Sequence, residues 1–474
     1  MEQTYRGGYS GTATSTATTP MRSGTPENAA RGPFEDTVTP AAASRGNPFA
    51  SPTNSRPASS TGSSSAVNRG IPNRYFHSRR VRKGEIEKPW KGKKDPKEKW
   101  VTILPLLGLA AGFAIAGFLV YDGIHSVVHH SYCPVLSDDF SSGLNKNVWT
   151  QEAEVGGFGN GEFEQTTVTD ENVFIRDSKL VIKPTLQDAS LIQGIKTINL
   201  TLDGTCTSSI LSNCVAVTNL TAGNTTIVPP VRSGRINTKK GATIKYGRVE
   251  VTAMLPEGDW LWPAIWMLPV NDTYGVWPAS GEIDIVESRG NNYTYTQGGN
   301  NIVSSTLHWG PDSTNDAWWR TNVKRTALHT TYATSEHTFG LEWSQKYLFT
   351  YINSRLLQVL YTNFNEPLWK RGNFPLSDAN GTRIVDVWSQ TGRDQTPFDQ
   401  EFYLILNVGV GGTNGWFQDG ASGKPWVDAS ETAKLDFWNA RDDWYPTWQK
   451  AGAGEMVISK VQMWRQCDGN EAQS

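Results

Sequence analysis

Hydrophobic positions follow two different patterns along the chain. Residues 101–121 form an apolar run of 21 residues without a charged side chain. A helix of that length covers the hydrocarbon core of a bilayer, which is about 30 Å thick. From residue 133 onward, short alternating or apolar runs are broken by Gly, Pro, Asn and Asp, and long runs with a period of 3.6 residues are absent. The pattern therefore predicts one membrane-spanning helix followed by a β-rich region.

The β-rich region contains several runs that are typical of strands. The expected strands are residues 179–183, 246–253, 337–342, 347–352, 402–408 and 456–464. Strands that are spread over about 330 residues, with turn residues between them, favour one large sandwich over a string of small domains. We therefore predict a single all-β domain over residues 133–470.

The region before the apolar run has a different composition. Residues 1–73 are rich in Ser, Thr, Pro, Gly and Ala, and a segment with so few large apolar residues is expected to be disordered. Residues 79–99 hold ten Lys or Arg against four Asp or Glu. Nuclear-localisation and nucleic-acid-binding segments have similar basic runs. The apolar run that follows directly favours the cytoplasmic flank of a membrane span instead.

Charge on the two sides of the apolar run predicts its orientation. Residues 122–145 contain no Lys or Arg, so the basic side is expected to stay cytoplasmic. We expect a single-pass type II membrane protein with a cytoplasmic tail (1–99), a span through the lipid bilayer (100–121), a linker (122–132) and a lumenal or extracellular domain (133–470). Its membrane is the plasma membrane, next to the cell wall, or a membrane of the secretory pathway. A cleaved signal peptide is disfavoured because the apolar run begins about a hundred residues into the chain.

Two weaker expectations concern partners. Gly108, Gly112 and Ala116 form a stripe of small residues that could support a weak homodimer through the membrane helix. Lys and Arg number 44 against 46 Asp and Glu, so the overall charge offers no reason to bind a polyanion. We therefore expect no nucleic-acid partner.

Cysteines and glycosylation signals lie on one side of the apolar run. All four cysteines follow it, which fits an oxidising compartment. Three pairings are possible. We favour Cys206 with Cys214 as a local clamp, and Cys133 with Cys467 as a tie between the ends of the domain; four free thiols are the alternative. Six Asn-X-Ser/Thr sequences agree with a lumenal domain and predict a glycoprotein: Asn199, Asn219, Asn224, Asn271, Asn292 and Asn380.

Tryptophan is abundant in the predicted domain. Of 19 Trp residues, 17 lie beyond residue 133. Such a domain is expected to present flat apolar faces as well as burying them. Sugar rings are one class of ligand that stacks on such faces.

An acidic segment carries the clearest candidate chemistry. Residues 281–288 read GEIDIVES. In a regular strand Glu282 and Asp284 share one face and Glu287 points the other way. One bulge residue, Ile285 or Val286, would return Glu287 to the same face.

Three carboxylates on one face repel one another, and catalysis supplies a reason to keep them. In retaining glycoside hydrolysis, one ionised carboxylate attacks the sugar and one protonated carboxyl group donates a proton to the leaving oxygen. We expect Glu282 to be the nucleophile, Glu287 the acid and base, and Asp284 the residue that orients Glu282. We also expect an ionised Glu282 to raise the proton affinity of Glu287. A solvent-facing acidic strand paired with lysines is the alternative, but no Lys lies nearby.

Longer motifs around this segment resemble a known family. Residues 260–269 (WLWPAIWMLP), 274–281 (YGVWPASG) and 282–291 (EIDIVESRGN) resemble glycoside hydrolase family 16, and within it the laminarinases and related β-1,3-glucan recognition proteins. Further matching segments follow in order at residues 137–140, 233–236, 246–250, 337–343 and 397–407.

The resemblance implies a fold and a set of site residues. The fold is a concanavalin A-like jelly-roll β-sandwich whose concave sheet forms a glucan cleft, with Glu282, Asp284 and Glu287 at its floor. It also implies a cleft lined by Trp277, Trp266, His308, Trp262, Trp416 and Asn160. A plain packing role is the alternative for each tryptophan, and a structural role is the alternative for His308.

The resemblance leaves the reaction open between related activities. It implies a retaining endo-β-glucanase for β-1,3- or β-1,3/1,4-glucan, or a transglycosylase that remodels cell-wall glucan. Some relatives carry a calcium ion, but no cluster of Asp and Glu in this sequence has the spacing of such a site, so we expect no metal and no other cofactor. A β-glucan-binding recognition protein without catalysis is the main alternative, and a scaffold for wall synthesis that acts through its tail is a third. Residues 188–230 are longer than the compact family pattern, and a lid, a glycan-bearing loop and an inert insertion all remain open for them.

Overall fold

The structure is a computed structural model that describes residues 80–92, 95–126 and 130–467. The chain divides into a helical unit within residues 11–127 and a β-rich unit within residues 128–474. Residues 1–73, for which disorder is expected, lie outside the described residues.

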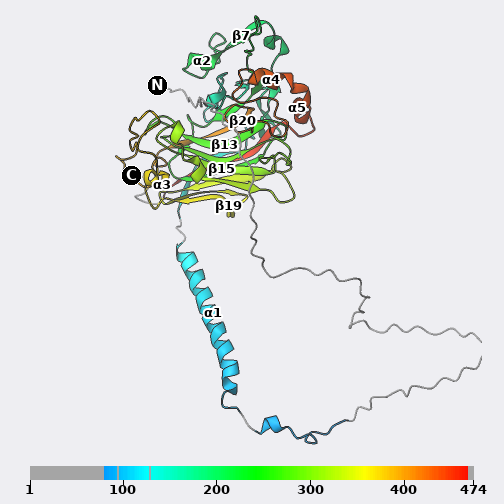
Figure 1. The fold of residues 1–474 in the computed structure, drawn as a ribbon, viewed down its shortest axis with the longest axis vertical. Coiled ribbons are helices and arrows are strands. Elements are labelled where there is room, and N and C mark those ends of the chain that lie inside the picture. The colour runs from blue at the N-terminus through cyan, green and yellow to red at the C-terminus, as the bar shows by residue number, and fades with distance from the viewer. Residues whose placement is uncertain (1–79, 93–94, 127–129, 468–474) are drawn as a thin grey trace, which may run out of the picture. The chain divides into compact units, whose positions relative to one another are not determined.

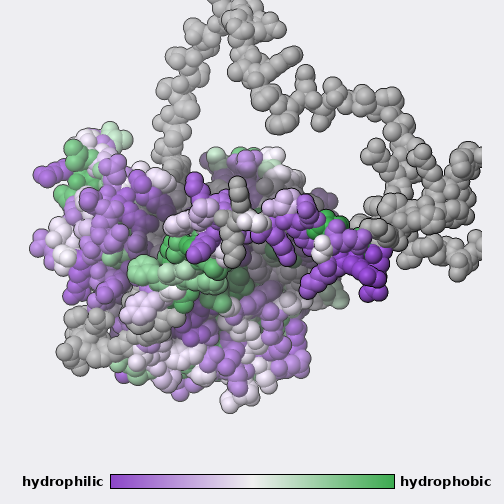
Figure 2. All heavy atoms as spheres, turned by 90° about the horizontal axis from the view of Figure 1, so that it is seen from below, coloured by the Kyte–Doolittle hydropathy of each residue, from purple (hydrophilic) through white to green (hydrophobic). Residues whose placement is uncertain are grey.

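The helical unit contains a short 3-10 helix, η1 (Pro89–Lys91), and a long helix, α1 (Glu98–Ser126). α1 includes the whole segment 100–121, and it is long and apolar enough to cross a membrane. Its apolar side chains are exposed, and Figure 2 shows them gathered in green. The crossing itself stays a prediction, as do the orientation of the helix and its pairing with a second copy.

The β-rich unit is built from two eight-stranded sheets (Figure 1). The outer sheet has the order β19-β18-β17-β12-β21-β5-β4, and β1 pairs with β21. Its strands are β1 (Tyr132–Asp138), β4 (Val173–Arg176), β5 (Lys179–Ile182), β12 (Gly247–Met254), β17 (His337–Trp343), β18 (Tyr347–Ile352), β19 (Ser354–Asn363) and β21 (Met456–Gln466).

The second sheet, which we call the site sheet, has the order β16-β15-β14-β13-β20-β10-β2, and β11 pairs with β20. Its strands are β2 (Thr150–Gln151), β10 (Arg235–Asn237), β11 (Thr243–Ile244), β13 (Leu261–Pro269), β14 (Glu282–Ser288), β15 (Ile302–His308), β16 (Asn322–Thr326) and β20 (Phe402–Val410). The strand pairs of both sheets are antiparallel.

One hydrophobic core joins the two sheets. In β12, burial alternates strictly along the strand, so that Val249 and Val251 are buried while Arg248 and Glu250 are partly exposed. The same buried cluster contains residues of both sheets: Val251, Leu341 and Val461 from the outer sheet, and Ile265, Met267, Ile283 and Leu404 from the site sheet. The prediction of an all-β sandwich is confirmed, and each of the six expected strands coincides with a strand of the structure.

Residues 188–230 fold into a small packed lobe. The lobe contains η3 (Ala189–Ile192), β7 (Ile195–Asn199), α2 (Leu211–Cys214) and β8 (Val215–Asn219), and β7 pairs with β8. Its apolar residues form a second buried cluster with Ala153, Val155 and Trp438 of the main domain. Trp438 belongs to α4 (Ala433–Asn439), which precedes α5 (Arg441–Trp448).

The remaining elements are short. A three-stranded sheet joins β3 (Glu164–Thr166), β9 (Val231–Ser233) and β6 (Thr185–Leu186). Single turns of helix are η2 (Gly157–Gly159), η4 (Ser313–Asn315), η5 (Trp318–Arg320) and α3 (Leu368–Gly372).

Both favoured disulfides are present. Cys133 pairs with Cys467 and Cys206 pairs with Cys214, so none of the four cysteines is free. The first bond joins the beginning of β1 to the end of β21, and the second lies within the lobe of residues 188–230.

Candidate active site

The acidic strand β14 contains the expected bulge. Opposite β13, Ile265 pairs with Val286 and Trp266 pairs with Asp284, so Ile285 is the extra residue. The register with β15 shifts over the same interval. An extra residue restores the alternation of faces beyond it, and the prediction of a bulge at Ile285 or Val286 is confirmed at Ile285.

The bulge brings the three carboxylates to one face of the strand. Glu282 and Asp284 alternate with Ile283, which is fully buried in the core between the sheets. Beyond the bulge Val286 is also buried in that core, and Glu287 returns to the face of Asp284. This face therefore carries the three acidic groups that the sequence places together.

Ser305 on β15 fixes the bulge from behind. Its Oγ donates to the carbonyl oxygen of Ile285 at 2.6 Å, and Thr350 Oγ1 donates to Ser305 Oγ at 2.8 Å. Thr350 belongs to β18 of the outer sheet, and both side chains are buried. The carbonyl that leaves the regular ladder at the bulge is thus satisfied by a residue that sequence reasoning missed.

Glu282 lies among groups of both charges. Trp277 Nε1 donates to Glu282 Oε2 at 2.7 Å, and the Trp277 ring lies 5.5 Å from the His308 ring. Burial and the neighbouring Asp284 raise the pKa of Glu282 well above its usual range, while His308 acts in the opposite direction.

Glu287 accepts a hydrogen bond from Trp262 Nε1 at 3.0 Å. Burial and then Asp284 raise the pKa of Glu287 to about 8, against the smaller opposing effects of His308, Trp262 and Arg289. The charge that raises this pKa is therefore that of Asp284. The expectation that an ionised Glu282 also raises the proton affinity of Glu287 stays a prediction; the two carboxyl groups interact electrostatically.

His308 bridges two carboxylates. Its Nδ1 lies 2.5 Å from Asp316 Oδ2, and its Nε2 lies 3.3 Å from Asp284 Oδ2. Burial opposes a charge on the ring, but Asp316, Asp284 and Glu282 outweigh it and raise the pKa of His308 well above its usual range. A positively charged ring is thus held beside the acidic face. Asp316 was missed because it lies in a loop, outside any motif.

Among the residues that the structure describes, Glu282, Asp284 and His308 form a group that could hold a cation, because their ligand atoms lie within 4.8 Å of one another. A metal would have to displace the proton on His308, since only neutral imidazole binds metals. The expectation of no metal and no cofactor stays a prediction.

The expected tryptophans lie beside these carboxylates. The rings of Trp262 and Trp416 are stacked, with centroids 4.7 Å apart and an angle of 10° between the planes. Trp266 Nε1 donates to Asn407 Oδ1 at 2.8 Å. Trp266 and Trp277 both pack against the small apolar cluster of Leu268, Tyr403 and Ile405. Trp262, Trp266 and Trp277 therefore surround the acidic strand, and Trp416 covers Trp262.

Asn160 connects two loops at one end of this region. Its Nδ2 donates to Glu162 Oε1 at 2.9 Å, and its Oδ1 accepts from Asn414 Nδ2 at 3.1 Å. The backbone N–H of Thr413 donates to the Asn160 carbonyl at 3.0 Å. Asn160 thus lies next to the loop that carries Trp416 and contacts none of the three carboxylates directly.

Arg235 is a further residue of this face. Its guanidinium lies 4.1 Å from the Phe158 ring and 4.8 Å from the Trp266 ring, and it forms an ion pair with Glu152 at 2.7 Å. The segment 233–236 carries part of the family resemblance, but the sequence alone did not mark Arg235 as a site residue.

Comparisons with known proteins show which proteins this chain is similar to. A sequence model described as "Glycosyl hydrolases family 16" matches residues 188–397. A "Beta-1,3-glucan-binding protein" of Penaeus monodon is 40% identical over 348 residues, which cover 70% of this chain and 90% of that protein. A "Glucan endo-1,3-beta-glucosidase A1" of Niallia circulans is 30% identical over 264 residues, which cover 54% of this chain and 29% of that protein. The laminarinase from Rhodothermus marinus aligns with a TM-score of 0.45 and 23% identity over 72% of this chain and 100% of that chain. The chain therefore belongs to glycosyl hydrolase family 16.

Proposed function

We propose that this protein is a retaining endo-β-glucanase that cleaves β-1,3- or β-1,3/1,4-glucan, with residues 133–470 as the catalytic domain. The observation that carries the proposal is the bulged strand β14, which presents Glu282, Asp284 and Glu287 on one face. The pKa of Glu287 is raised to about 8, so this residue holds a proton at neutral pH. A protonated carboxyl beside a second carboxylate is what glycoside hydrolysis requires.

In the first half-reaction Glu282 attacks the anomeric carbon, and Glu287 transfers its proton to the departing glycosidic oxygen. The attacking carboxylate must be ionised. The Trp277 N–H and the charged ring of His308 favour that form. They act against burial and Asp284, which raise the pKa of Glu282. Positive charge that develops on the sugar in the transition state favours the ionised form further.

In the second half-reaction Glu287, now ionised, takes a proton from water. The water oxygen attacks the anomeric carbon and releases Glu282. A sugar hydroxyl in place of water would give transglycosylation with the same residues. We assign sugar-stacking roles to Trp262, Trp266, Trp277 and Trp416, because aromatic faces beside the carboxylates suit pyranose rings. His308 and Asn160 complete the proposed substrate-binding set.

The test uses the full-length protein, purified in detergent, with β-1,3-, mixed-linkage and β-1,6-glucans. We expect shorter or longer products by mass spectrometry from a β-1,3-linked substrate, and none from the Glu282→Ala and Glu287→Ala variants. NMR of the first product should show a retained β anomer. An inverted anomer, or turnover that survives both substitutions, would contradict the assigned roles.

A second candidate is β-glucan recognition without cleavage. It is favoured by the name of the Penaeus monodon relative, which is a β-1,3-glucan-binding protein. The presence of Glu282, Asp284 and Glu287 together favours the enzyme. Retention of the wild-type protein on immobilised β-1,3-glucan, with no change in glucan chain length, would establish the recognition protein instead.

We further propose a type II membrane placement, in which α1 spans the bilayer and the domain is lumenal or extracellular. The length and apolar surface of α1, the basic segment before it and the two disulfides support this placement. We expect the protein to stay in the membrane during carbonate extraction. In sealed microsomes the domain should be protected from protease. Glycosidase treatment should lower the mass of the protein, because the domain is expected to carry glycans. Release by carbonate would contradict the anchor.

A further inference from the structure

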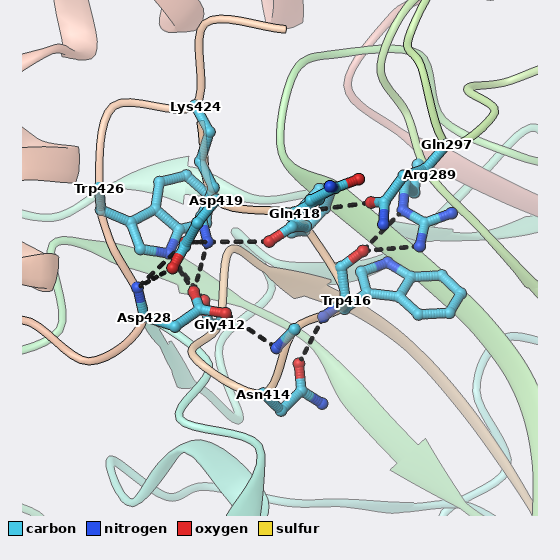
Figure 3. Close-up of polar contacts among 12 residues, drawn as sticks. Arg289, Gln297, Gly412, Asn414, Trp416, Gln418, Asp419, Lys424, Trp426 and Asp428 are labelled. Carbon is cyan, nitrogen blue, oxygen red and sulfur yellow. Dashed lines mark hydrogen bonds and ion pairs between the residues drawn. The ribbon is translucent and has the colours of Figure 1, made fainter. Parts of the chain in front are cut away.

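Arg289 follows Glu287 by two residues, and it is buried, with 6% of its surface exposed. Its Nε and Nη2 donate to the carbonyl oxygen of Trp416 at 3.0 and 2.6 Å, and its guanidinium lies 3.9 Å from the centre of the Trp416 ring (Figure 3). Within residues 130–467, no carboxylate lies at ion-pair distance from Arg289. Burial lowers the pKa of Arg289 to about 10. Burying a charge without an ion pair costs free energy. This cost points to a role for the contact between Arg289 and Trp416.

The loop that Arg289 holds is itself closed by a buried lysine. Lys424 Nζ donates to the Phe417 carbonyl at 2.8 Å and forms ion pairs with Asp419, at 2.5 Å, and with Asp428 (Figure 3). The Lys424 side chain is fully buried. Because a buried ammonium needs each of these partners, the lysine gathers the loop from residue 417 to residue 428 into one unit.

Two further contacts fix the residues next to Trp416. Asp428 Oδ2 accepts from the Gly415 N–H at 2.9 Å, and Asn414 Oδ1 accepts from the Trp416 N–H at 3.1 Å. Trp426 Nε1 donates to the Gly412 carbonyl at 2.8 Å. The loop that carries Trp416 is therefore held by several internal contacts, and Arg289 joins this loop to the end of β14.

From Trp416 the contacts return to the proposed acid. The Trp416 ring is stacked on Trp262, and Trp262 Nε1 donates to Glu287. These contacts form a closed set: the chain links Glu287 to Arg289, Arg289 contacts Trp416, and Trp416 packs on Trp262, which contacts Glu287. Movement of Trp416 would loosen Trp262 and the hydrogen bond that orients the Glu287 carboxyl.

We infer that Arg289 is a positioning residue, which places the Trp416 loop so that Trp262 and Trp416 form one platform and Trp262 orients Glu287. The inference rests on the proposed function for its kinetic consequences, and it rests on geometry alone for the position of Trp416. Arg289 has a second, separable effect, because its positive charge favours the ionised form of Glu287 and opposes the rise in the pKa of that group.

Two substitutions separate these effects. Arg289→Met removes both the hydrogen bonds to the Trp416 carbonyl and the positive charge. We expect kcat/KM to fall by about 10- to 100-fold. The basic limb of the pH profile should move to higher pH, because Glu287 loses a charge that favours its ionised form. Arg289→Lys keeps the charge but cannot reproduce the paired contact. It should lower kcat/KM by a smaller factor and leave the basic limb in place.

Arg441 provides a matched control. It donates to the Trp438 carbonyl at 3.1 Å and lies 4.6 Å from the ring of Trp438, which belongs to the second buried cluster. We expect Arg441→Met to leave kcat/KM and the pH profile unchanged. Asn414→Ala loosens Trp416 from within the loop at an exposed position, and it serves as a second variant in case Arg289→Met does not fold.

Crystal structures of the Arg289 and Asn414 variants decide the geometric part independently of activity. We expect the Trp416 ring to leave its stack with Trp262. An unchanged stack of Trp416 on Trp262 in these variants would overturn the inference, even if the wild-type protein cleaves glucan. Variants whose kcat/KM and pH profile equal those of the wild type would also overturn it. A wild-type protein that cleaves no glucan would instead refute the proposed function, and the position of Trp416 would still decide the inference.

Discussion

Asp316 holds the charge on His308, and this residue lies outside every motif that the sequence displays. Its carboxylate contacts His308 Nδ1 at 2.5 Å, and Asp284 contacts the other ring nitrogen. Loss of the Asp316 charge lowers the pKa of His308. Burial opposes the charged ring, and one of the negative groups that counter this effect is then missing. A neutral His308 no longer favours the ionised form of Glu282.

We therefore expect Asp316→Asn to move the acidic limb of the pH profile of kcat/KM to higher pH and to lower kcat/KM at pH 6 by about tenfold, which corresponds to about 1.4 kcal/mol. The measurement is a pH–rate profile on a β-1,3-glucan oligomer. Asp312→Asn alters a carboxylate of the same loop that caps η4, and it should leave the acidic limb in place. Identical profiles for both variants would contradict the role of Asp316.

Glu287 should reduce the stability of the fold at higher pH. Its pKa is about 8 in the folded protein, against about 4.3 in an unfolded chain. The folded state therefore binds more protons between these values, and stability falls as pH rises through that window. Glu287→Gln mimics the protonated group, so we expect its melting temperature to exceed that of wild type at pH 8 and to approach it near pH 4.5. Glu431→Gln, at an exposed position, should show no such trend.

At the scale of single elements, β14 depends on a side chain of its neighbour. Ser305→Ala would leave the Ile285 carbonyl without its buried donor, and an unsatisfied buried group costs about 1–3 kcal/mol. We expect a lower free energy of unfolding in urea together with a lower kcat/KM, because the bulge determines where Glu287 lies. Ser459→Ala removes two longer contacts on the outer sheet, to the Thr252 carbonyl at 3.3 Å and to Glu336 Oε2 at 3.1 Å. It should change kcat/KM little, and an equal loss in both variants would count against a specific role for the bulge.

The strands could largely be predicted from patterns of residues that are close in the sequence. Alternation of buried and partly exposed positions in β12 is visible in the sequence as VEVTA. The spacing of Glu282, Asp284 and Glu287 along the strand is sufficient to predict a bulge. The choice of Ile285 over Val286 was not readable, because the pairing with Ile265 and Trp266 and the Ser305 hydrogen bond decide it.

At the scale of the whole molecule, the Cys133–Cys467 disulfide joins residues separated by 334 positions. A cross-link over so long a loop restricts the unfolded chain strongly, by up to about 5 kcal/mol. We expect the Cys133→Ser/Cys467→Ser double variant to melt at a lower temperature and to keep its kcat/KM at 25 °C, since the bond lies at the end of β21. Cys206→Ser/Cys214→Ser removes a bond over a separation of 8 residues. It should affect the main melting transition less, and the opposite ranking would contradict the argument.

The sequence by itself determined the all-β class, the apolar helix α1, the acidic face of β14 and the family, because each depends on residues that are close along the chain. Only the tertiary structure decided that Asp316 lies against His308, that Ser305 supports Ile285 across 20 residues, and that Arg289 holds the Trp416 carbonyl across 127 residues. These contacts arise where strands and loops from distant parts of the chain pack together. No local periodicity specifies them, since the free energy that forms them comes from burying both partners at once.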